Sequence, residues 1–109
     1  MNKQISEADW KLWRNLSKQA LERYCNRILQ DVSKYATGTE SAHAQYLKLF
    51  KHIEHCDKII ADVFNDSRRS NAINRIAIAI GKGLISRDEL ATFSEETQAL
   101  VKLWLDEYR

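Results

Sequence analysis

Residues 46–64, YLKLFKHIEHCDKIIADVF, decide the fold of this chain. Side chains suited to a core follow one another there at alternating steps of three and four residues, the spacing that keeps them on one face of an α-helix: Tyr46, Leu49, Ile53, Cys56, Ile60 and Val63. Phe50 and Phe64 widen this stripe on one flank, and Ile59 widens it on the other. The stretch therefore predicts a central helix that the rest of a short chain has to cover.

The length and composition of the chain set the scale of the fold. With 109 residues, of which 44% are hydrophobic, the sequence predicts a single domain over residues 1–109 with a real core. Proline is absent, and the three glycines are Gly38, Gly81 and Gly83. Because these residues interrupt helices and occur at only two places, long uninterrupted helices are expected.

The first half of the chain predicts a helical hairpin. Ser6 and Asp9 have the spacing of a capping box, so a helix is expected to begin there and to run to about residue 36. Gly38 is expected to provide a left-handed cap between this helix and a second one over residues 40–65. A connection this short forces the two helices to lie antiparallel.

The second half predicts shorter helices. A corner over 65–71 is followed by a third helix that ends at Gly81. Ser86 and Glu89 form a complete capping box that predicts a short helix, and a last helix follows from about Ser94. The expected fold is all-α: a long antiparallel helical hairpin with a third helix and a short helix plus C-terminal helix packed across it, a four- to five-helix bundle.

Charge is unevenly distributed along the chain, although the net charge is only +2. Residues 67–87 carry five basic side chains and no acidic one. Two arginines there precede a new helix, where cations oppose the helix dipole and an anion would be favoured. The sequence thus gives a candidate site for an anion or a protein partner at this basic corner, with two tryptophans of the first helix beside it: Ser67, Arg68, Arg69, Ser70, Arg75, Trp10 and Trp13. In the alternative interpretation the arginines only cap the second helix or pair with Asp66.

A nucleic-acid-binding module that uses residues 68–87 is a second hypothesis. The third helix, the glycine turn and the short helix after Ser86 have the outline of a helix-turn-helix. Asp88 and Glu89 stand at the start of the would-be recognition helix, where phosphate would repel them. A basic face neutralised by the acidic C-terminal segment explains the same pattern.

A metal-binding bundle is the third hypothesis. His52 and Cys56 are four residues apart on a helix, which is a chelating spacing, and the hairpin brings Cys25 near them. Cys56 also fits the stripe as a small buried residue, and that interpretation is preferred, so no metal ligand and no cofactor are predicted. Asp57 interrupts the apolar flank between Phe50 and Phe64, and we expect it to form a salt bridge with Arg14 or Arg23.

The sequence shows no nucleophile with an evident base and no paired carboxylates at a shared site, so it does not predict an enzyme. The expected function is that of a non-catalytic helical interaction or regulatory protein that binds another protein. A homodimer is also expected, because several predicted helices are apolar on more than one side. No signal peptide or membrane-spanning run is evident, which predicts a cytoplasmic protein with no membrane association and with reduced cysteines.

Overall fold

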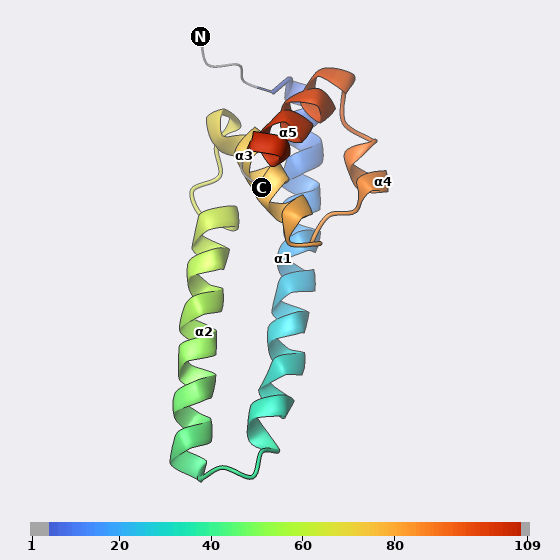
Figure 1. Cartoon of the computed structure of the whole chain (residues 1–109). Coiled ribbons are helices and arrows are strands. Elements are labelled where there is room, and N and C mark those ends of the chain that lie inside the picture. The colour runs from blue at the N-terminus through green and yellow to red at the C-terminus, as the bar shows by residue number, and fades with distance from the viewer. Residues whose placement is uncertain (1–4, 108–109) are drawn as a thin grey trace.

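A computed structural model describes residues 5–107, which form α-helices, one turn of 3-10 helix and no strand (Figure 1). The helices are α1 (Glu7–Ala36), α2 (Ala42–Phe64), α3 (Ala72–Gly81), α4 (Arg87–Leu90) and α5 (Glu95–Glu107), and the 3-10 turn is η1 (Arg69–Asn71). The predicted all-α fold, with its long antiparallel hairpin, is confirmed. None of the helices described is long and apolar enough to cross a bilayer.

The start of α1 differs from the expected capping box. The Ser6 hydroxyl accepts a hydrogen bond from the Asp9 amide over 3.1 Å, so Ser6 is the N-cap as predicted. The reciprocal bond of a capping box, from the Ser6 amide to the Asp9 carboxylate, does not form. The Asp9 carboxylate accepts hydrogen bonds from Ser94 and Thr97, and Asp9 is only 3% exposed. A carboxylate near the start of α1 therefore fixes the start of α5.

The prediction that Gly38 caps the hairpin turn was wrong. Gly38 does not adopt a left-handed conformation, and α2 begins after Ser41, whose hydroxyl accepts from the Ala44 amide over 3.2 Å. The side chain of Gln45 donates hydrogen bonds to the carbonyls of Gly38 and Glu40. Polar side chains thus close the connection without the conformational freedom of glycine.

The core lies at one end of the hairpin, where α3 and α5 pack against each other and α3 contacts both long helices (Figure 1). Fully buried residues there come from four helices and include Trp13, Val63, Ile76 and Val101. The molecule is 53 Å long and 24 Å across, because the opposite end of α1 and α2 projects alone from this core.

The predicted stripe on α2 is buried only over its second half. Cys56 and Val63 are buried, whereas Tyr46 is 60% exposed and Ile53 is 45% exposed. At 3.6 residues per turn, Val63 stands roughly 100° around the helix from Tyr46, so one neighbouring helix does not cover both. The prediction that Tyr46 and Ile53 belong to the core was therefore wrong.

The turn between α3 and α4 contains the left-handed glycine of this fold. Gly83 has a φ of 70°, and the carbonyls at the end of α3 are satisfied by the amides of Lys82, Gly83 and Leu84. The predicted capping box before α4 is confirmed, since Ser86 and Glu89 bond each other reciprocally over 3.0 Å and 3.1 Å.

Candidate interaction surface

At the basic corner, Arg68 has a partner within the corner itself. Its guanidinium group donates to both carboxylate oxygens of Asp66, over 3.1 Å and 3.0 Å. The side chain of Asn71 holds the same turn, because it accepts from the Arg68 amide and donates to the Asp66 carbonyl. The alternative interpretation, in which Asp66 pairs with one of the arginines, matches this geometry.

The other arginines of the corner point elsewhere. Arg69 donates to the carbonyl of Ile5 over 3.0 Å, so it connects η1 to the segment before α1. Arg75 is half-buried on α3, and its Nη1 is buried without a hydrogen-bond partner. These two guanidinium groups therefore do not converge with Arg68 on one anion.

The tryptophans proposed to lie beside the corner do not give it an exposed aromatic surface. Trp13 is completely buried and cannot contact a partner, while Trp10 is half-buried. Ser67 and Ser70 are exposed. The seven residues proposed for anion or partner binding therefore do not form one site. Some belong to a turn whose charges pair with each other, one bonds the segment before α1, and others belong to the core.

The segment proposed for nucleic-acid binding does not present a recognition helix. α4 has four residues, and its Glu89 accepts two hydrogen bonds from Arg23 on α1, over 2.7 Å and 2.9 Å. This bond with Arg23 is the main cause that lowers the pKa of Glu89 to about 2. This ion pair ties α4 to α1.

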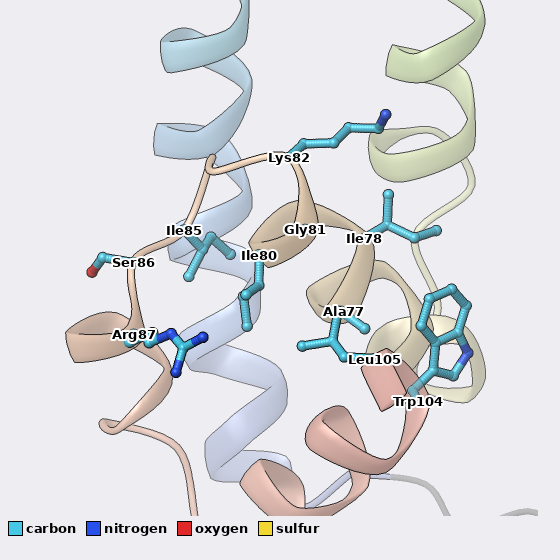
Figure 2. A pocket seen from close by; sticks show the side chains of 10 residues that line it. All are labelled: Ala77, Ile78, Ile80, Gly81, Lys82, Ile85, Ser86, Arg87, Trp104 and Leu105. Atoms are coloured by element: carbon cyan, nitrogen blue, oxygen red, sulfur yellow. The ribbon is translucent and has the colours of Figure 1, made fainter. Parts of the chain in front are cut away.

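Two cations of this segment lie at the edge of a shallow pocket between α3, α4 and α5. The pocket has a volume of about 670 Å³, with an apolar floor that includes Ile78, Ile80 and Leu105 (Figure 2). Lys82 extends from the turn after α3, and Arg87 extends from the start of α4 (Figure 2). No acidic side chain lines this pocket, so the local field there is positive.

The histidine and cysteine proposed as metal ligands lie at the interface of α1 and α2. Asp31 Oδ2 is 3.0 Å from His52 Nε2, and Cys56 Sγ is 3.6 Å from the same nitrogen. Across residues 5–107 no three His, Cys, Asp or Glu side chains are arranged to hold a metal ion. Cys56 Sγ also lies 4.0 Å from Nδ1, the other ring nitrogen of His52.

Tyr24 completes this interface. Burial, together with a hydrogen bond to Cys56, raises the pKa of the Tyr24 phenol to about 12. The Tyr35 ring packs at 5.3 Å from the His52 ring. Cys25 is half-buried, and both cysteines are free thiols. The cluster therefore packs α1 against α2 through polar and aromatic contacts.

The predicted salt bridge of Asp57 was wrong. Arg23 pairs with Glu89 instead, and Asp57 is exposed on α2 with neither a hydrogen bond nor an ion pair among the residues described. A carboxylate on the flank of an apolar stripe does not need a partner when that flank faces water.

The surface that sequence reasoning missed is the projecting half of the hairpin, residues 25–55, which we call the arm. Not one of these residues is buried. Within residues 5–107, the large hydrophobic side chains that remain exposed are Leu29, Tyr46, Leu47, Phe50 and Ile53 in the arm, and Leu103 on α5. The hydrophobic spacing was visible in the sequence, but it does not show whether another helix covers it.

Comparisons of this chain with protein-family models, with curated proteins and with solved structures found no match. The candidate sites are therefore weighed on their geometry alone.

Proposed function

We propose that this protein is a non-catalytic helical module that binds another protein chain along its arm. The observation that carries the proposal is the clustering of exposed apolar side chains on α2, where Tyr46 is 60% exposed, Phe50 is 50% exposed and Ile53 is 45% exposed. An exposed apolar stripe at helical spacing is the pattern by which amphipathic helices recognise helical or grooved partners.

The shape of the molecule supports the same function. Four-helix bundles bury the apolar faces of their helices in a shared core, and the arm has only two helices. The rings of Tyr46 and Phe50 stack on each other with their centres 6.3 Å apart, which presents a continuous aromatic surface. Aromatic residues contribute most strongly to the energy of protein interfaces.

The basic corner, which the sequence favoured as the partner site, has a smaller role in this proposal. Its Arg68 is already neutralised by Asp66, and a partner would have to break that ion pair to use it. The arm needs no such rearrangement, so we place binding there.

Site-specific photo-cross-linking in cells of the native host tests the proposal. A photoreactive amino acid at position 50 should give cross-linked products heavier than the monomer. The same amino acid at position 103 is the matched control, because Leu103 is 63% exposed but lies on α5. Equal cross-linking from both positions, or none from position 50, would contradict binding along the arm.

A further inference from the structure

We infer that the chain bound along the arm is a second copy of this protein, with the two α2 helices packed antiparallel about Phe50. This inference rests on the proposed function and names the partner of the same surface. It is carried by the order of side chains along one face of α2.

That face has five members at alternating steps of three and four residues: His43, Tyr46, Phe50, Ile53 and Asp57. All five are exposed. The three central residues are apolar, the N-terminal member can carry a positive charge, and the C-terminal member is an anion. We call these five residues the α2 stripe.

Its two ends are polar groups with no partner in the described part of the chain. Neither His43 nor Asp57 takes part in a hydrogen bond or an ion pair there. The imidazole offers an N–H donor in either protonation state, and the carboxylate is an acceptor. Each end therefore has the group that the other lacks.

Antiparallel pairing of two copies brings these ends together. A two-fold axis near Phe50 sets residue 43 of one copy opposite residue 57 of the other, and the reverse contact follows from symmetry. Tyr46 and Ile53 then lie in adjacent layers on each side of the axis. The α2 stripe is thus complementary to itself, with an imidazole N–H donor opposite a carboxylate acceptor at each end, which is what a symmetric dimer needs.

The flanking charges favour the same orientation. Residues 42–52 of α2 contain no acidic side chain, whereas residues 53–64 contain Glu54, Asp57 and Asp62. Lys48 already pairs with Glu40, which leaves Lys51 as the cation of the first half. Even with Lys58, residues 53–64 keep an excess of acidic side chains. Antiparallel packing therefore places the first half against the net acidic half of the partner, while parallel packing would align the net acidic halves.

Packing two arms together also gives each arm a core to cover its exposed apolar side chains. Each contributes two helices, so the product is a four-helix arrangement with a core between them. The contact from His43 to Asp57 covers 15 residues, about 21 Å of helix from the first to the last. The apolar side chains that one arm leaves in water would then be covered by the same side chains of its partner.

Sedimentation equilibrium on the purified protein tests the inference. At micromolar concentration the wild type should approach a mass of twice 12.7 kDa. Phe50→Ser should weaken dimerisation at least about 100-fold because the side chain is lost from both copies at the axis. Leu103→Ser, which removes a side chain from α5 that is 63% exposed, should leave dimerisation unchanged.

Charge reversal tests the orientation. His43→Glu and Asp57→Lys should each weaken dimerisation about tenfold, since a symmetric dimer contains the pair twice. The double variant should recover the wild-type affinity. The antiparallel pairing is overturned if the double variant does not recover the affinity, or if Phe50→Ser leaves dimerisation unchanged. Circular dichroism of each variant is the folding control, and it should show the helix content of the wild type because the substituted positions are exposed.

The mass of the purified protein and cross-linking in host cells distinguish a wrong partner from a wrong surface. A purified wild type that stays monomeric overturns the second copy as partner. If position 50 still cross-links to a protein in host cells, the arm remains an interaction surface with a different occupant.

Discussion

The guanidinium group of Arg23 on α1 donates hydrogen bonds to both carboxylate oxygens of Glu89 on α4, across 66 positions of sequence. The same guanidinium also donates to the Leu84 carbonyl over 2.8 Å. Arg27, one turn further along α1, donates to the carbonyls of Lys82 and Gly83. Two arginines thus attach the α3–α4 turn to the hairpin at the point where the arm begins.

This ion pair makes stability depend on pH. The pKa of Glu89 falls from 4.5 to about 2, chiefly because of Arg23, so its contribution to the free energy of unfolding is complete above about pH 4.5 and is lost as the pH falls toward 2. Glu89→Gln should lower stability at pH 7 by about 1 to 2 kcal/mol, and this difference should shrink at pH 3. Urea unfolding at the two pH values measures it.

Glu22→Gln is the control for that measurement, because Glu22 is exposed on the same helix as Arg23. It should change the free energy of unfolding by less than about 0.5 kcal/mol. A Glu89→Gln variant as stable as this control at pH 7 would show that the pair contributes nothing to the fold.

Asp9 makes a second prediction. Burial raises the pKa of this carboxyl, but the hydrogen bonds from Ser94 and Thr97 lower it by more, so it lies below the ordinary 3.8. Asp9→Asn should reduce stability by about 1 to 3 kcal/mol, because a buried carboxylate oxygen that accepts from Ser94 and Thr97 is replaced by an NH2 group, which can only donate. Asp62→Asn, at an exposed position of α2, should be neutral. Thermal unfolding that gives equal losses for both would contradict the role of Asp9 in fixing α5.

The glycines give a third prediction. Gly83→Ala should destabilise the fold by about 1 to 2 kcal/mol, because an L side chain is strained at a φ of 70°. Gly38→Ala should be neutral or slightly stabilising, since its φ is not left-handed and no atom lies within 4 Å of the added Cβ. Denaturant unfolding of the two variants distinguishes them, and the opposite order would mean that the hairpin turn rather than the α3–α4 turn needs glycine.

Local patterns were sufficient for the helices and for some of their caps. Ser86 and Glu89 were paired correctly because a capping box acts within four residues. Asp9 was assigned to the same kind of motif, yet it bonds Ser94 and Thr97, more than 80 positions away. A local motif cannot show that a distant helix end will compete for the same carboxylate.

The candidate site was harder to predict than the fold. The stripe around Tyr46 has the spacing of a core, and the sequence gives no sign that α3 and α5 cover only one end of the hairpin. Pairing of Arg68 with Asp66 is local and was among the alternatives in the sequence, whereas the bond from Arg69 to the Ile5 carbonyl forms only in the folded chain. Burial and charge neutralisation are set by tertiary packing.

Cross-linking of single cysteines tests most directly the central claim that two arms pack through the α2 stripe. In a Cys25→Ser background, where Cys56 stays buried, a bis-maleimide with a short spacer would be applied to Leu47→Cys and to Lys58→Cys, two exposed positions of α2 outside the stripe. In the antiparallel dimer the two copies of position 47 stand about 9 Å apart along the helices and should be linked efficiently. The two copies of position 58 stand about 24 Å apart and should not be linked. Equal linking at both positions would indicate parallel packing, and no linking at position 47 would contradict the dimer.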